Sequence, residues 1–72
     1  MNAAHRAGMK YGKKLAGGFT PNPNQAFREG SASYLWDNGG RYNLETAVSA
    51  RRDFEAGARA GYMEVIGKEF AQ

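Results

Sequence analysis

The residues of this chain that could do chemistry are mainly its cations. Five basic side chains lie within the first 28 residues, which contain no acidic residue: Arg6, Lys10, Lys13, Lys14 and Arg28. Residues 29–72 carry five basic and seven acidic side chains, so the net charge of +3 originates in the first part of the chain. Such an asymmetry indicates an anionic partner, and cations four residues apart on a helix form a row that can follow nucleic-acid phosphates. A solvated helix face that keeps the chain soluble would carry the same charges.

Aromatic residues are interleaved with these cations, as in proteins that bind single-stranded or looped RNA by stacking. Tyr11 and Phe27 are expected in the core, because the chain has few other large apolar residues. Phe19, Trp36 and Tyr42 lie near helix-breaking residues and are better candidates for exposed contacts. Exposed aromatic side chains near loops serve a protein interface equally well.

Residues that could support catalysis or metal binding are sparse. His5 is the single histidine and there is no cysteine, so neither a transition-metal site nor a disulfide framework is expected. No serine has the spacing of a nucleophile elbow, and no glycine-rich segment has the spacing of a phosphate-binding loop. Asp53 and Glu55 are expected to pair with arginines of the same helix, Glu55 with Arg59 four residues later. We therefore expect no enzyme activity and no cofactor.

The composition predicts a small all-α domain, 1–72. The chain has 72 residues, of which 42% are hydrophobic, but twelve of these are alanine. Only five residues are β-branched, too few for a sheet. A core this poor predicts a marginal fold that associates with a second copy or joins a larger assembly. Because no apolar run has the length of a membrane span or signal peptide, we expect a cytoplasmic protein and no membrane contact.

Capping and helix-breaking residues predict two or three helices, at about 3–16, 24–36 and 44–70. Asn2 and Asn43 can cap the first and last of them, and Gly17-Gly18 ends the first. In the Pro/Asn linker that follows, Asn22 can act as a cap with Pro23 at the first helical position. The Asp-Asn-Gly-Gly sequence at 37–40 predicts a turn before the last helix.

A seven-residue repeat in the last helix predicts a buried seam. It runs through Leu44, Ala47, Arg51, Phe54, Ala58, Gly61 and Val65. Arg51 is the one charged member, so the seam requires a carboxylate of a neighbouring chain to pair with it.

Two pairs of glycines four residues apart stand in the first and last helices. They are Gly8 with Gly12 and Gly57 with Gly61. Two glycines cost a helix ~2 kcal/mol of propensity, which indicates a packing role. Glycines at this spacing leave a flat face where two helix backbones approach closely. The two pairs are expected either to meet within one chain or to face another subunit.

The order of glycines and linker resembles the ribosome modulation factor family, short chains of two helices around a proline-containing linker. Residues 4–8 with Gly12 and Gly17-Gly18 resemble the first helix, and Asn22-Pro23-Asn24 resembles the linker. Residues 54–57 with Gly61-Tyr62 resemble the last helix. The family's cysteine-proline-tyrosine linker is absent, Phe54 replaces its tryptophan, and residues 24–52 look like an insertion. The resemblance implies binding of ribosomal RNA during hibernation, without enzyme activity.

The sequence therefore predicts a small non-catalytic binding protein. The first interpretation is an RNA- or ribosome-associated factor that contacts phosphates through its basic N-terminal helix. The second is a phage- or plasmid-type accessory protein that binds and inhibits a host protein through the exposed aromatic residues. The third is a small structural subunit of a larger viral or ribonucleoprotein assembly. All three predict a macromolecular partner and no small-molecule cofactor, and the poor core predicts a homo-oligomer or an assembly subunit.

Overall fold

The computed structural model describes residues 2–70, and the side chains of residues 2–67. The chain forms three α-helices, α1 (Ala3–Ala16), α2 (Pro23–Asp37) and α3 (Leu44–Phe70), with a turn of 3-10 helix, η1 (Gly39–Arg41), before α3. Residues 2–70 contain no strand, so the predicted all-α fold with two or three helices is confirmed. Within this described part, no helix is both long and apolar enough to cross a membrane.

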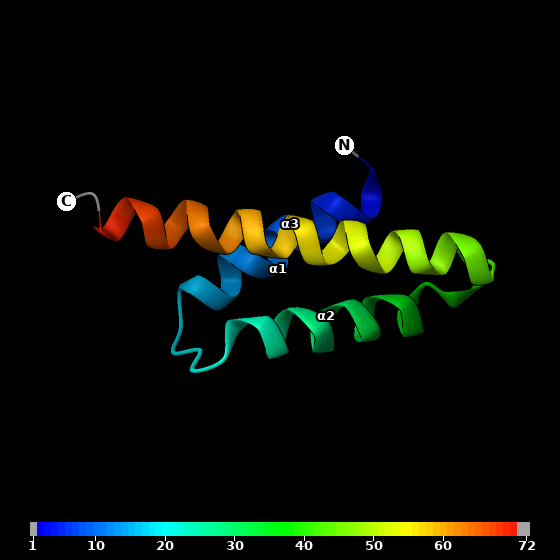
Figure 1. The fold of residues 1–72 in the computed structure, drawn as a ribbon, viewed down its shortest axis with the longest axis horizontal. Helices are drawn as coiled ribbons and strands as arrows, with labels where there is room; N and C mark the ends of the chain where they lie inside the picture. Colours follow the sequence, from blue (N-terminus) through cyan, green and yellow to red (C-terminus); the bar gives the residue numbers. More distant parts are fainter. Residues whose placement is uncertain (1, 71–72) are drawn as a thin grey trace.

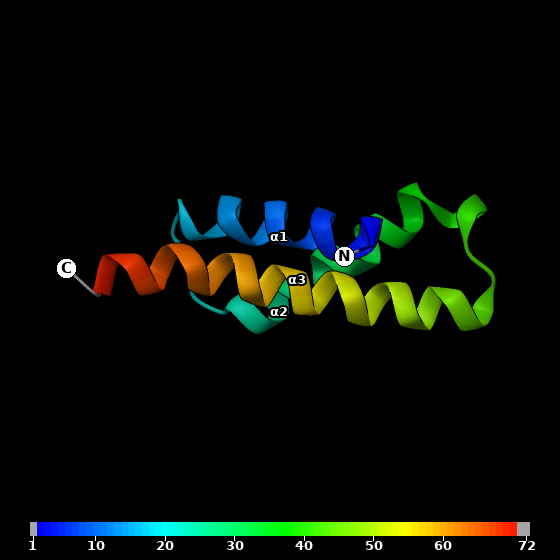
Figure 2. The same ribbon diagram turned by 90° about the horizontal axis from the view of Figure 1, so that it is seen from above.

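The first and third helices run parallel and side by side, and α2 runs antiparallel to them (Figures 1 and 2). Two polar contacts show the register of the parallel pair. The Asn2 amide donates to Asp53 at 2.7 Å, and the Lys13 ammonium lies 3.6 Å from Glu64. Because both contacts join residues 51 positions apart, α1 and α3 advance together along their length.

Asparagine side chains begin all three helices, as predicted. Asn2 accepts a hydrogen bond from the His5 backbone N–H at 2.8 Å. Asn22 does the same for Gln25 at 3.3 Å, with proline at the start of α2. Asn43 accepts from the Thr46 N–H at 2.9 Å. Each cap satisfies a backbone donor that has no partner inside the helix.

The end of α1 at Gly17 lies where the sequence predicts it, but its conformation differs from the usual glycine cap. Gly17 has φ −76° and ψ −7°, so it remains right-handed instead of adopting the left-handed cap conformation. Its N–H bonds the carbonyls of Lys13 and Lys14 at 3.3 and 3.2 Å. The helix therefore ends by a tightened last turn.

The core is small and largely aromatic. Phe27 and Phe54 are buried, and the ring centroid of Phe54 lies 5.2 Å from that of Tyr34 and 5.6 Å from that of Tyr11. The ring of Phe27 meets that of Tyr62 edge-on at 5.7 Å. Three buried alanines, one from α1 and two from α3, complete the cluster: Ala4, Ala50 and Ala58. Aromatic pairs from different helices thus supply much of the packing that the few aliphatic residues cannot.

The glycine pairs lie where α1 and α3 meet within one chain. A Cβ added at Gly8 would lie 2.9 Å from the Ala58 backbone nitrogen, and one at Gly12 would lie 2.8 Å from the Ala58 carbonyl carbon. On the opposite helix, a Cβ at Gly61 would lie 2.9 Å from the Met9 carbonyl carbon. Gly57 faces the His5 carbonyl in the same way. These separations are too short for a side chain, so the two backbones meet directly.

Within one chain, the predicted seam of α3 is buried only over its second half, and its pairing with a neighbouring chain stays a prediction. Leu44 is 85% exposed and Arg51 is exposed, whereas Phe54, Ala58 and Gly61 are buried. The reason is the register of α1, since Asn2 bonds Asp53 and the first turns of α3 extend past the start of α1. Arg51 pairs within its own chain, with Glu55 at 3.5 Å. Glu55 therefore pairs with Arg51 and not, as expected, with Arg59.

Candidate nucleic-acid interface

Three of the five predicted cations form a row on the outer face of α1. Arg6, Lys10 and Lys14 are exposed and follow one another every four residues, about 6 Å apart along the helix axis. The opposite face of α1 is the buried stripe of small residues against α3: Ala4, Gly8, Gly12 and Ala16. Among the described residues, no carboxylate lies within ion-pair distance of these three cations. We call them the α1 row.

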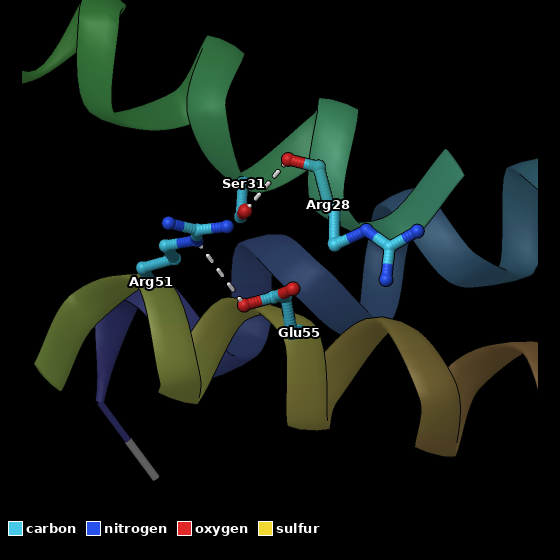
Figure 3. Close-up of polar contacts among 4 residues, drawn as sticks. All are labelled: Arg28, Ser31, Arg51 and Glu55. Carbon is cyan, nitrogen blue, oxygen red and sulfur yellow. Dashed lines mark hydrogen bonds and ion pairs between the residues drawn. The ribbon is translucent and has the colours of Figure 1, made fainter. Parts of the chain in front are cut away.

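The other two predicted cations lie elsewhere. Lys13 stands on the α3 side of α1, where Glu64 is its partner. Arg28 lies on the edge of α2 that faces α3, and Figure 3 shows its guanidinium turned away from Arg51 and Glu55. The structure therefore separates Lys13 and Arg28 from the α1 row.

A second basic area, which we call the arginine surface, lies on α3. Three arginines surround a shallow hollow of about 320 Å³ together with Val48 and Glu55: Arg51, Arg52 and Arg59. Sequence reasoning assigned these three arginines to salt bridges and missed the area. The signal was present in part, because residues 52 and 59 share one side of a helix.

A groove of about 460 Å³ lies between α1 and α2. Its apolar floor includes Tyr11, Tyr34 and the buried Phe54, and Lys10 and Lys14 line its α1 side. The α2 side carries three polar residues, Glu29, Ser33 and Asp37. Sequence analysis did not find the groove, because nothing in the sequence shows that α2 approaches α1 less closely than α3 does.

Tyr11 holds the two walls of this groove together. Its hydroxyl donates to the Ala26 carbonyl at 3.1 Å, and its ring lies so close to Gly30 that a Cβ there would stand 2.7 Å from the ring carbon that bears the hydroxyl. Gly30 is therefore a contact residue of α2, although in the sequence it looks only like a helix-weakening residue. The arrangement fixes one tyrosine ring along the floor of the groove.

The predicted exposed aromatic residues divide in two. Phe19 and Trp36 are 94% and 88% exposed. They lie in the α1–α2 link and in the last turn of α2, and so at opposite ends of α2, about 20 Å apart along the helix. The prediction for Tyr42 is wrong, because its ring is half-buried against Tyr34, with centroids 6.2 Å apart.

The hydroxyl groups of Tyr34 and Tyr42 share a hydrogen bond of 2.8 Å. This bond is the largest cause of a raised pKa for Tyr34, followed by burial, and the nearby Arg41 opposes it. Tyr34 therefore acts as a neutral hydrogen-bonding group near pH 7. They tie the end of α2 to the segment that precedes α3.

The few groups that could do covalent or metal chemistry are dispersed. His5 lies in the first turn of α1, where its carbonyl faces Gly57. Ser31 is fully buried and donates to the Arg28 carbonyl at 2.8 Å (Figure 3). In the described part of the chain, no three His, Asp or Glu side chains gather closely enough to hold a metal ion.

Comparisons with known proteins identify no relative from which a function could be inferred. Neither a family model, nor a curated protein, nor a solved structure matches this chain. Any inference about function therefore rests on the chemistry of three surfaces: the α1 row, the arginine surface and the α1–α2 groove.

Proposed function

We propose that the protein is a small non-catalytic RNA-binding factor that contacts single-stranded RNA through the α1 row. The observation that carries the proposal is the free row itself: Arg6, Lys10 and Lys14 are exposed, evenly spaced and without a carboxylate partner among the described residues. Cations that are not neutralised by the protein are available to phosphates, and binding then releases counterions from the RNA. A ribosomal target is the finer part of the proposal and rests on the resemblance to ribosome modulation factors.

The neighbouring groups support RNA over a purely solubilising role for these charges. Lys10 and Lys14 border a groove floored by Tyr11 and Tyr34. Lysines beside aromatic rings are the combination with which proteins hold single strands, since phosphates meet the cations and bases meet the rings. If these lysines served only solubility, they would not need aromatic rings beside them.

A salt titration of binding to an oligouridylate tests the proposal. Each phosphate contact to a single strand contributes ~0.7 to the slope of log affinity against log salt, so three contacts give a slope of about −2. Doubling the salt concentration should then weaken binding roughly fourfold. The double variant Lys10→Ala/Lys14→Ala removes two of three contacts and should reduce the slope to about one third.

Lys13→Ala is the matched control for this experiment. Lys13 lies on the same helix but is paired with Glu64, so its removal should change the slope little. Binding that ignores salt, or a slope that survives the double substitution, would refute the proposal. Circular dichroism of each variant shows whether the helices are retained.

A second candidate function, docking on a protein, has support from one observation. Phe19 and Trp36 are almost fully exposed, and aromatic residues are enriched at protein interfaces. Their separation along α2 means that one partner would have to cover the length of the molecule, or that two contacts are made. Replacement of both by serine should abolish capture of a protein partner, while salt-dependent RNA binding through α1 would persist.

A further inference from the structure

The α1–α2 groove offers three kinds of contact on the scale of one nucleotide. Its floor is formed by the rings of Tyr11 and Tyr34, both in contact with the buried Phe54. Lys10 and Lys14 provide positive charge along one wall. The volume of about 460 Å³ lies within the range of ~300–1,000 Å³ that is usual for small-molecule sites.

The opposite wall carries two carboxylates with different surroundings. Glu29 and Asp37 are eight residues apart on α2, about 12 Å along the helix axis. Because α2 runs antiparallel to α1, Glu29 lies toward the Lys14 end of the groove and Asp37 toward the Ala7 end. Glu29 accepts a hydrogen bond from Gln25 at 3.2 Å, whereas Asp37 has no partner among the described side chains.

We infer that the groove binds one unstacked guanosine of a single-stranded RNA. The phosphates on either side of this nucleotide lie one on Lys10 and one on Lys14, the base covers the tyrosine rings, and the Asp37 carboxylate accepts hydrogen bonds from the edge of the base. This assignment rests on the proposed RNA-binding function and adds base preference to it. A cationic row alone positions an RNA but carries no information about its sequence.

The preference for guanine follows from the hydrogen-bonding groups of a carboxylate. An ionised carboxylate only accepts hydrogen bonds and can take two parallel N–H groups at once. On its Watson–Crick edge guanine presents two adjacent donors, the N1–H and the N2 amino group. Adenine and cytosine place an acceptor beside their amino group, and uracil places carbonyls on both sides of its single N–H. Asp37, with its oxygens free, thus favours guanine over the other three bases.

Five short RNAs test this inference. Each has four uridines around a central guanosine, inosine, adenosine, cytidine or uridine, and binding is followed by fluorescence anisotropy of a label on the RNA. The guanosine RNA should bind about tenfold more tightly than the adenosine, cytidine and uridine RNAs, within the range for a bidentate base contact. Inosine keeps the N1–H but lacks the N2 amino group, so its RNA should bind with intermediate affinity.

Two substitutions in the same wall provide matched variants. Asp37→Asn should bring the affinity for the guanosine RNA down to that for the uridine RNA, because the amide presents a donor where the base needs an acceptor. Glu29→Gln removes a negative charge near the phosphate on Lys14, so it should tighten binding of all five RNAs to a similar extent and preserve the guanosine preference. Both residues are exposed, so neither change disturbs the core.

The outcomes separate this inference from the proposed function. Equal affinity for all five RNAs, with the expected salt dependence, would overturn the guanosine site and leave RNA binding intact. Absence of salt-dependent binding to any of them would overturn both. A guanosine preference that persists in Asp37→Asn would also overturn the site. Competition by free GMP as strong as that by the guanosine RNA would assign the groove to a free nucleotide and overturn its role in RNA binding.

Discussion

Two glycines of α3 have opposite surroundings. A Cβ at Gly57 would lie 3.0 Å from the His5 carbonyl carbon and 3.1 Å from the Met9 nitrogen, whereas a Cβ at Gly67 would meet nothing within 4 Å. Gly57→Ala should therefore lower the free energy of unfolding, because overpacking costs ~1–3 kcal/mol and helix propensity returns ~1 kcal/mol or less. Gly67→Ala gains the same helix propensity without a clash, so it should raise the free energy of unfolding. Urea denaturation distinguishes the two, and a stabilised Gly57→Ala would show that the helix backbones can separate at little cost.

The hydroxyl pair of Tyr34 and Tyr42 makes stability depend on alkaline pH. The pKa of Tyr34 in the folded state lies above the ordinary value of 10.0, chiefly because of its hydrogen bond to Tyr42. The folded state therefore favours the neutral phenol, and this stabilisation is complete below pH 10 and is lost as the pH rises through the folded pKa. The free energy of unfolding should fall more steeply above pH 10 in the wild-type chain than in Tyr34→Phe. Parallel profiles from denaturation at pH 8 to 11 would contradict this.

The bounds of the helices are the part of the fold that the sequence predicted best. The predicted 3–16, 24–36 and 44–70 compare with Ala3–Ala16, Pro23–Asp37 and Leu44–Phe70. Local chemistry explains the agreement, because an asparagine cap, a proline at the first helical position and paired glycines act within a few residues of each helix end. The same locality explains why exposure of the first half of the α3 seam within one chain could not be predicted, since it depends on where a different helix begins.

The candidate site was predictable only as far as it lies on one helix. The spacing of Arg6, Lys10 and Lys14 places them on a shared face of α1, and the structure agrees. That Lys13 has Glu64 as a partner, and that Arg28 lies beside α3, depends on the parallel register of α1 and α3 and on the packing of α2. These contacts join residues far apart in the sequence, so no local pattern indicates them.

The N-terminal cap of α3 predicts how much the stability of this helix depends on Asn43. Asn43 and Thr46 bond reciprocally, since each backbone N–H donates to the other side chain at 2.9 Å. Asn43→Ala should lower the free energy of unfolding by ~1 kcal/mol, within the range of ~0.5–2 kcal/mol for such caps. Asn24→Ala is the control, because Asn24 is exposed inside α2 and makes no side-chain hydrogen bond within the described residues. Equal thermal unfolding of the two variants would show that α3 does not depend on its cap.

In the whole molecule, both glycine pairs lie at the contact between α1 and α3 of the same chain. Their close contact between α1 and α3 leaves no glycine face for a second subunit. Self-association, expected from the poor core, stays a prediction and would require another surface, such as the end of the molecule where Trp36 and Leu44 are exposed. Sedimentation velocity over a range of concentrations measures it directly.

The molecule carries two separate basic areas, so the position of the positive charge can be tested apart from its total. Lys10 and Lys14 of the α1 row line the α1–α2 groove, whereas the arginine surface lies on α3. The variants Lys10→Ala/Lys14→Ala and Arg52→Ala/Arg59→Ala each remove two positive charges from a chain of net charge +3. Both should slow association by weakening long-range attraction to RNA.

Only loss of the α1 lysines should change the number of phosphate contacts. We expect the salt slope to fall to about one third in Lys10→Ala/Lys14→Ala, by the loss of ~0.7 per contact, and to stay near the wild-type value in Arg52→Ala/Arg59→Ala. The comparison is made with one single-stranded RNA over the same salt series, with circular dichroism to verify helicity. The reverse pattern would move the RNA to the arginine surface, where Glu55 is already paired with Arg51 and the other arginines are free to bind phosphate.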